Sequence, residues 1–191
     1  MDQVQPELRR ADAQDIPVML AIAEAHFGEG YVDDVSPYFD ESCGVALVAT
    51  AADRVVGFVL ARRCGKGEAD RLIPRIPADC SDISYADAAG TLGVIKTIAV
   101  APDKLGCGVG KALFCAAEGS LTNLGVNLAI VPAWFDGKGV NIAGLMKAMA
   151  YQKFTVDRHY WKQECEAGIF LCPSKSKETC VCGVEFYKRK V

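Results

Sequence analysis

The chain has 191 residues, of which 51% are hydrophobic and 24% charged, and its formal net charge at pH 7 is −3. This hydrophobic content suffices for one sizeable core, so we expect a single domain. A mildly acidic chain is a poor general nucleic-acid binder, because such proteins carry a basic face. No apolar run is long enough to cross a bilayer, and the opening MDQVQPELRR lacks the apolar segment of a secretory signal. We therefore expect a cytoplasmic protein without a membrane or nucleic-acid partner.

The N-terminal part of the chain predicts a strand, a helix and a hairpin. A short strand at Glu7 to Arg10 precedes a helix that Asp12 or Asp15 can cap, with Pro17 in its first turn. The apolar residues of that helix share one face: Ile16, Met19, Leu20, Ala23 and Phe27. Residues 28–40 indicate a loop with a short second helix. The apolar runs 45–50 and 54–63 indicate a β-hairpin.

The remainder of the chain alternates strands and helices. Residues 64–91 are polar and interrupted by glycine and proline, which favours a long loop with little regular structure that covers a site. The segments expected next are a central strand at 92–100, a glycine-rich loop, a helix at 108–122, a strand at 126–131, a helix in 141–154 and closing strands in 154–165 and 179–190. This order predicts an α/β fold.

The glycine-rich loop PDKLGCGVGKALF, residues 102–114, has the composition of an anion-binding turn. Glycines at alternate positions let the backbone approach an anion closely, and the free N–H groups of the following helix can hold a pyrophosphate. Lys104 and Lys111 add positive charge. The P-loop pattern fails, because Leu105 stands where its first glycine belongs and Ala112 where its hydroxyl belongs. The dinucleotide fingerprint fails too, since its third glycine falls on a lysine or a leucine.

The segment IAVAPDKLGCGVGKALF resembles the acetyl-CoA motif of the GNAT N-acetyltransferase superfamily. Val100, Pro102, Gly108 and Gly110 stand at the motif's positions. Further agreement comes from Gly106, Val109, Lys111, Ala112 and Leu113. The first strand and helix and the hairpin 45–63 also match the family's order, so the resemblance covers roughly residues 7–160. It implies a mixed, twisted sheet with helices on both faces.

The resemblance also implies a co-substrate and a chemistry. Acetyl-CoA would be held by the end of the central strand and by the loop: Ile98, Ala99, Val100, Leu105, Gly106, Cys107, Gly108, Val109, Gly110 and Lys111. Family members transfer the acetyl group by direct attack of a primary amine, and strand N–H groups around Ile98 to Val100 would stabilise the oxyanion. Two positions depart from the family: Leu105 replaces the arginine or glutamine that opens the loop, and Met149 replaces a proton-donating tyrosine.

The remaining catalytic groups are open. Tyr151 and Tyr160 are candidate proton donors, with a structural role as the alternative. No carboxylate lies on the strand before the loop, so the general base is unassigned; the loop residues Glu68, Asp70, Asp82 and Asp87 are candidates, or solvated charges. We interpret His26 and His159 as structural residues, His159 within a strand. Trp134, beyond strand 126–131, either lines an acceptor pocket or packs in the core.

The last 27 residues contain four of the nine cysteines, Cys165, Cys172, Cys180 and Cys182. Thiolates are ligands for a structural zinc, and this tail looks like the cysteine-rich ending of some prokaryotic relatives, with Lys175 in place of one cysteine. Reduced, buried thiols are the alternative.

Together these features predict an acetyltransferase domain at 1–164 and a cysteine-rich tail of the same domain at 165–191. The expected function is an acetyl-CoA-dependent N-acetyltransferase with a small-molecule or peptide amine as acceptor. A CoA-binding sensor or interaction module without transfer activity, with a metal-stabilised tail, is the alternative. The resemblance makes a homodimer possible, since dimers are common in the superfamily.

Overall fold

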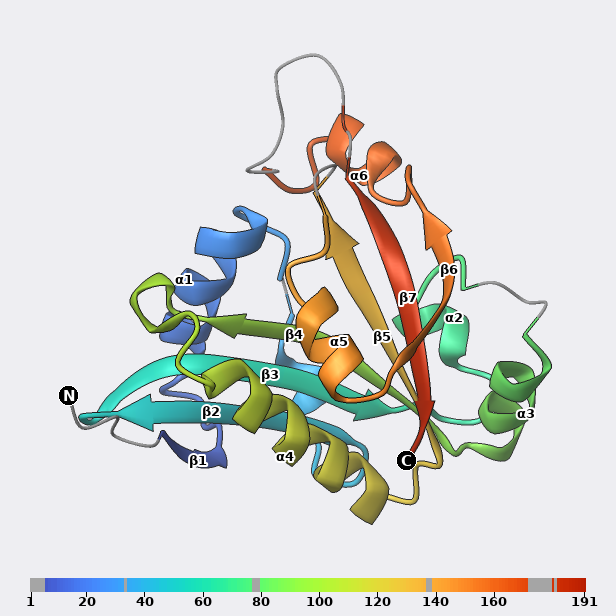
Figure 1. Cartoon of the computed structure of the whole chain (residues 1–191), viewed down its shortest axis with the longest axis horizontal. Coiled ribbons are helices and arrows are strands. Elements are labelled where there is room, and N and C mark those ends of the chain that lie inside the picture. The colour runs from blue at the N-terminus through green and yellow to red at the C-terminus, as the bar shows by residue number, and fades with distance from the viewer. Residues whose placement is uncertain (1–5, 33, 77–79, 137–138, 172–179, 181) are drawn as a thin grey trace.

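The computed structural model describes residues 6–32, 34–76, 80–136, 139–171, 180 and 182–191. Its centre is a seven-stranded sheet in the order β1-β2-β3-β4-β5-β7-β6 (Figure 1). The strands are β1 (Glu7–Arg10), β2 (Gly44–Ala51), β3 (Arg54–Arg63), β4 (Leu92–Val100), β5 (Leu128–Phe135), β6 (Gln152–Asp157) and β7 (Gly183–Lys190). Neighbouring strands are antiparallel except β4 and β5, which are parallel. The predicted α/β sheet, hairpin and central strand are confirmed.

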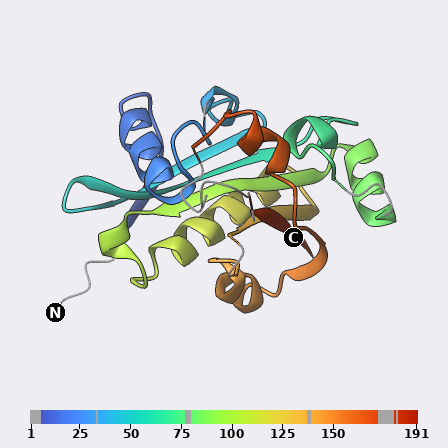
Figure 2. The ribbon, with the colours of Figure 1, turned by 90° about the horizontal axis from the view of Figure 1, so that it is seen from above.

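Helices cover both faces of this sheet. On one face, α1 (Ile16–Phe27) and the 3₁₀ turn η1 (Ser36–Tyr38) pack on β2, β3 and the end of β4. On the other face, α4 (Val109–Asn123) and α5 (Ala143–Ala148) close the largest core cluster, where Leu113, Phe114 and Met146 are fully buried. Figure 2 shows α1 and α4 on opposite sides of the sheet. No helix among the described residues is long and apolar enough to span a membrane.

The segment 64–91 contains two helices, so its prediction as an irregular loop is wrong. They are α2 (Ala69–Leu72) and α3 (Ser81–Ala89), and they pack on β4 through Ile73 and Ile83. Gly65 and Gly67 precede α2, Pro74 follows it, and Gly90 ends α3 in the left-handed conformation with φ 71°. Short helices of this kind depend on tertiary packing, which a polar composition does not reveal.

The C-terminal elements also differ from the predicted ones. Helix α5 ends at Ala148, well short of residue 154, and Ala150 has φ 56°, so the chain turns directly into β6. After β6 a turn leads into α6 (Lys162–Glu166), which places His159 in that exposed turn and not in a strand. Strand β5 extends to Phe135 because β7 pairs along its whole length, and Trp134 therefore lies within the strand.

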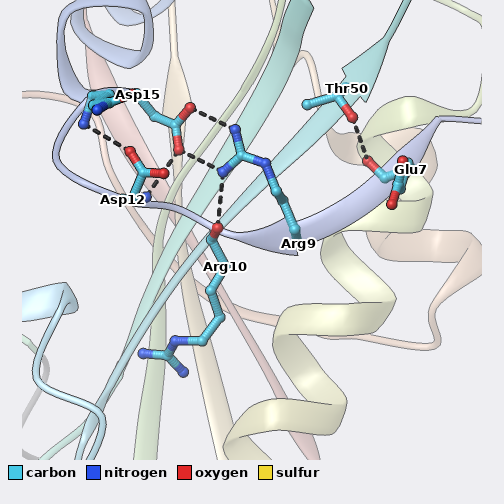
Figure 3. Close-up of polar contacts among 7 residues, drawn as sticks. Glu7, Arg9, Arg10, Asp12, Asp15 and Thr50 are labelled. Carbon is cyan, nitrogen blue, oxygen red and sulfur yellow. Dashed lines mark hydrogen bonds and ion pairs between the residues drawn. The ribbon is translucent and has the colours of Figure 1, made fainter. Parts of the chain in front are cut away.

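The start of α1 is fixed by an ion pair rather than by a side-chain cap (Figure 3). Asp15 is the N-cap residue, yet its carboxylate makes no cap hydrogen bond. It accepts two hydrogen bonds from the Arg9 guanidinium, at 2.7 and 2.8 Å, and a third from the Asp12 backbone N–H at 2.9 Å. This arrangement joins β1 to the first turn of α1.

The two parallel strands separate at one end. β4 and β5 pair only from Leu92 opposite Leu128 to Val94 opposite Ile130, and beyond that point they diverge (Figure 1). Lys96 is an extra residue in the β3–β4 ladder, between the pairs Ala61–Ile95 and Leu60–Thr97. A bulge of this kind bends a strand and increases its twist, so it accounts for the departure of β4 from β5. The separation leaves an opening in the centre of the sheet.

Candidate acyl-CoA site

A cleft of about 550 Å³ lies at the open end of β4. Its walls come from the end of α1, the last residues of β4, the glycine-rich loop, the first turn of α4 and the start of α5. All the residues that the sequence predicts for the co-substrate line it, except Cys107: Ile98, Ala99, Val100, Leu105, Gly106, Gly108, Val109, Gly110 and Lys111. The fold thus gathers two segments of the predicted motif around one cavity.

The end of β4 presents backbone hydrogen-bonding groups to this opening. The N–H of Ala101 bonds to the carbonyl of Val56 at 2.8 Å, so residue 101 faces β3. Backbone groups alternate in direction along an antiparallel ladder. Ile98 and Val100 therefore direct their N–H and carbonyl groups away from β3, towards the side that β5 has left. Of the predicted segment 98–100, these two residues are the ones that can donate to a bound acyl group.

The loop between β4 and α4 has the conformation of an anion-binding turn. Gly106 and Gly108 have φ values of 76° and 82°, and Gly108 is the residue that precedes the first turn of α4. A β-carbon at either position would meet no atom within 4 Å, so the glycines serve the backbone conformation and leave the space beside it open. Free N–H groups of the first helical turn attract anions. Lys104 and Lys111 line the same cleft.

His26, which the sequence suggests is a structural residue, lines this cleft. Its Nε2 lies 2.6 Å from the Val100 carbonyl oxygen, so an imidazole N–H donates to the end of β4. The contact joins the last turn of α1 to the strand that carries the predicted oxyanion donors. The two residues are 74 positions apart, and only the packing of α1 across the sheet brings them together.

No protein-family model and no curated protein matches this sequence. Among solved structures, the chain is similar to a phosphinothricin acetyltransferase of the GNAT superfamily from Sinorhizobium meliloti in complex with acetyl-CoA, at TM-score 0.65 and 16% identity over 98% of this chain and 89% of that one. The chain has the GNAT acetyltransferase fold.

Two other solved structures have a similar fold, and the name of the first gives an acceptor other than phosphinothricin. An agmatine N-acetyltransferase matches at TM-score 0.64 and 15% identity, over 97% of this chain and all of that one. Ard1 from Thermoplasma volcanium matches at TM-score 0.63 and 16% identity, over 98% of this chain and 99% of that one. At these identities the likeness establishes the GNAT fold and does not identify an acceptor for this chain.

Within the GNAT fold of this chain, aromatic residues surround the opening between β4 and β5. A small cavity of about 50 Å³ lies there, lined by Phe27, Tyr31 and Trp134 among others. Trp134 lies edge-on to Phe27 with ring centroids 5.9 Å apart, so it both packs and lines the opening, and the two roles predicted for it are not exclusive. Burial raises the pKa of the Tyr31 phenol above its usual range, so it stays a neutral hydroxyl.

Neither tyrosine predicted as a proton donor lies in the cleft. Tyr151 is buried and donates from its hydroxyl to Glu118 Oε1 at 2.8 Å, and this carboxylate also accepts from Arg189 at 2.6 Å. Tyr160 is buried on the opposite face and donates to the Pro74 carbonyl at 2.6 Å. Burial raises the pKa of Tyr160 to about 12. The geometry gives both side chains structural partners.

The four candidate carboxylates are also outside these cavities. None of Glu68, Asp70, Asp82 and Asp87 is among the residues that line the cleft, the opening or the adjoining pocket. Asp82 is paired with Lys188 at 2.7 Å, and this contact holds the pKa of Asp82 below its usual range. Asp87 accepts a hydrogen bond from the Ala69 N–H at 3.0 Å. These contacts serve α2 and α3.

Three cysteines of the tail meet in one apolar cluster. Cys165, Cys180 and Cys182 are buried together with Phe170, against Tyr31, Trp134 and Trp161. Within the described part of the chain, no group of three or more His, Cys, Asp or Glu side chains is arranged to hold a metal. Cys172, the fourth ligand predicted, lies outside the described residues. The structural zinc therefore stays a prediction.

Proposed function

We propose that this protein is an N-acetyltransferase that binds acetyl-CoA in the cleft and transfers the acetyl group to a primary amine. The observation that carries the proposal is the convergence of the strand end and the glycine-rich loop on one cavity of about 550 Å³. The pyrophosphate would lie at the N–H groups of the first turn of α4, with Lys104 and Lys111 beside it. The acyl end would reach the opening between β4 and β5.

Leu105 changes the expected balance of this binding site. Its side chain is 58% exposed and offers no hydrogen bond where the family has an arginine or glutamine. Backbone N–H groups and the two lysines would therefore supply the attraction for the phosphates. Such an interaction is screened by salt. We expect acetyl-CoA affinity to fall measurably as ionic strength rises.

The reaction would form a C–N bond and break the C–S bond of the thioester. The N–H groups of Ile98 and Val100 would donate to the carbonyl oxygen as negative charge develops on it. Stabilisation of this charge is usually the largest single contribution to the rate enhancement in acyl transfer. The ammonium of the acceptor loses one proton to solvent before attack, and the second proton passes to the departing thiolate. Among the described residues that line the opening, Tyr31 has a hydroxyl that stays protonated.

The proposal is tested by ligand-induced stabilisation and by product analysis. Acetyl-CoA at about one hundred times its Kd stabilises a fold by roughly 2.7 kcal/mol. For a domain of this size that corresponds to a rise in Tm of roughly 5 to 10 °C. Transfer should be followed by chromatography of CoA and of the acetylated amine, because the exposed thiols of Cys107 and Cys115 would react with thiol reagents. No rise in Tm at millimolar acetyl-CoA would overturn the proposal.

A further inference from the structure

A pocket of about 190 Å³ adjoins the opening on the α1 side of the sheet. It shares Tyr31, Lys96 and Thr97 with the small cavity between β4 and β5, and that cavity in turn shares Phe27 and Ile98 with the acyl-CoA cleft. We call it the outer pocket. The three cavities thus adjoin in sequence, with β4 in the wall of each.

Aromatic rings follow this sequence of cavities without a break. Trp134 lies against Phe27, Phe27 lies 4.9 Å from Tyr31, and Tyr31 lies 5.3 Å from Trp161, all between ring centroids. Tyr38 adds another ring to the outer pocket, where Val32 and Leu60 supply aliphatic wall. Aromatic side chains prefer to pack against other rings, edge-on or offset. A ligand with a ring would find such partners along the whole path.

The size of the outer pocket limits the acceptor. A cavity of about 150 Å³ suffices for a benzene ring, while pockets for drug-sized ligands begin at about 300 Å³. The outer pocket, at about 190 Å³, holds one ring with a few further atoms. The cavity between the strands, at about 50 Å³, leaves room for a group as small as the reacting amine.

Charge limits the acceptor as well. Asp34, at the exposed rim, is the one carboxylate among the described residues that line the outer pocket, and Lys96 is the one cation. Hydrogen bonds from Ser36 hold the pKa of Asp34 below its usual range, so its carboxylate is charged at neutral pH. The Lys96 ammonium donates to the Leu72 carbonyl at 3.1 Å. A polyamine would bring several cations to a pocket with one carboxylate and a resident ammonium.

We propose that the acceptor is a monoamine whose amino group is joined to one aromatic ring by a short aliphatic chain. The ring would lie in the outer pocket, and the amine would reach the opening between β4 and β5. The proposal rests on the proposed N-acetyltransferase activity. Asp34 would attract the ammonium as it passes the rim, and the rings of Tyr31, Tyr38 and Trp161 would contact the aromatic ring once it is bound.

A panel of amines tests this proposal on the full chain. Phenethylamine, tyramine and tryptamine should be acetylated with kcat/KM at least tenfold above that of spermidine, agmatine and a tripeptide with a free N-terminus. A preference for any of the last three, with normal acetyl-CoA binding, would overturn the acceptor class and leave the proposed transferase standing. If acetyl-CoA does not bind, the proposed function itself fails.

Matched variants connect the selectivity to the outer pocket. Val32→Phe fills the pocket and should lower kcat/KM for phenethylamine at least tenfold, with the Kd of acetyl-CoA unchanged within twofold. Val18→Phe makes the same change on the exposed face of α1, where Val18 is 42% exposed, and should change neither value. Asp34→Asn keeps an oxygen for the Ser36 N–H and should raise the KM of phenethylamine about twofold at low salt, because Asp34 lies at the exposed rim and its attraction for the ammonium is screened. Equal effects of the two phenylalanine variants would count against the assignment.

Binding can also be measured without turnover. The two tryptophans of the chain, Trp134 and Trp161, both line this path, so intrinsic fluorescence reports on it directly. Phenethylamine should change this fluorescence saturably, and Val32→Phe should abolish the change. A saturable signal would support the ligand class even if no acetyl transfer were detected, and no signal at tens of millimolar would contradict it.

Discussion

The His26 imidazole donates a hydrogen bond to the carbonyl of Val100, at 2.6 Å, and so joins the end of α1 to the end of β4. Both residues line the acyl-CoA cleft. The Val100 carbonyl belongs to the strand edge that β5 leaves uncovered, where a buried acceptor without a partner would be costly. His26 therefore satisfies this edge and fixes one wall of the cleft at the same time.

Removing the imidazole should weaken co-substrate binding. We expect His26→Ala to raise the Kd of acetyl-CoA about fivefold, because the wall formed by α1 is no longer tied to β4, and to lower the free energy of unfolding by about 1 kcal/mol. Titration calorimetry and urea unfolding measure the two effects. Glu24→Ala, on the exposed face of the same helix, is the control. An unchanged Kd in His26→Ala would show that the contact serves folding alone.

The glycine-rich loop offers a test of the anion site with a control at the opposite end of α4. Gly108→Ala forces a β-carbon onto a backbone with φ 82°, which costs about 1 kcal/mol and distorts the first turn of α4. Gly125→Ala imposes the same strain, at φ 85°, just beyond the other end of α4. Both variants should lose a few degrees of Tm, and only Gly108→Ala should raise the Kd of acetyl-CoA, by about tenfold. Equal Kd values would exclude the loop from the binding site.

Tyr151 is predicted to contribute to stability and not to turnover. Tyr151→Phe removes the donor to Glu118, which retains its ion pair with Arg189. Loss of this buried hydrogen bond should lower the free energy of unfolding by about 1 to 2 kcal/mol. The value of kcat should stay within twofold of wild type. A drop of a hundredfold or more, with stability intact, would restore Tyr151 as a proton donor.

The Arg9–Asp15 ion pair should make stability depend on pH at the acid end. Hydrogen bonds from Arg9 hold the pKa of Asp15 below its usual value of about 3.9, so the ionised carboxylate favours the folded state. This stability is present above the ordinary pKa and is lost as the pH falls through the lowered one. Asp15→Asn should therefore be less stable at pH 7, by about 1 kcal/mol given that Arg9 is 42% exposed.

Urea unfolding of both proteins at several pH values measures this dependence. The difference between wild type and Asp15→Asn should shrink as the pH falls below the ordinary pKa of an aspartate, because the wild-type carboxylate becomes protonated and both side chains are then neutral. Asp12→Asn, which changes a carboxylate exposed beside the same turn, should keep the wild-type dependence. A constant difference across the range would mean that the effect is steric.

The sequence by itself determined the elements whose signals are local. Apolar runs on either side of the turn at residues 51–53 predict the hairpin β2–β3, and β-branched residues predict β4. The glycines at 106 and 108 indicate a backbone conformation that only glycine adopts easily, and both have positive φ values in the structure. These features depend on the residue types and the backbone conformation of a few neighbouring residues. They can therefore be predicted without the rest of the chain.

The tertiary structure decided everything that depends on residues far apart in the chain. The bulge at Lys96 and the divergence of β4 from β5 arise from pairing with β3, and they create the opening. His26 meets Val100 because α1 packs across the sheet, and Tyr151 is removed from the cleft because α5 ends early and Glu118 of α4 takes its hydroxyl. The helices α2 and α3 exist through their burial on β4. No periodic pattern of residues in the sequence predicts contacts of this kind, because each depends on a packing geometry that only the folded chain has.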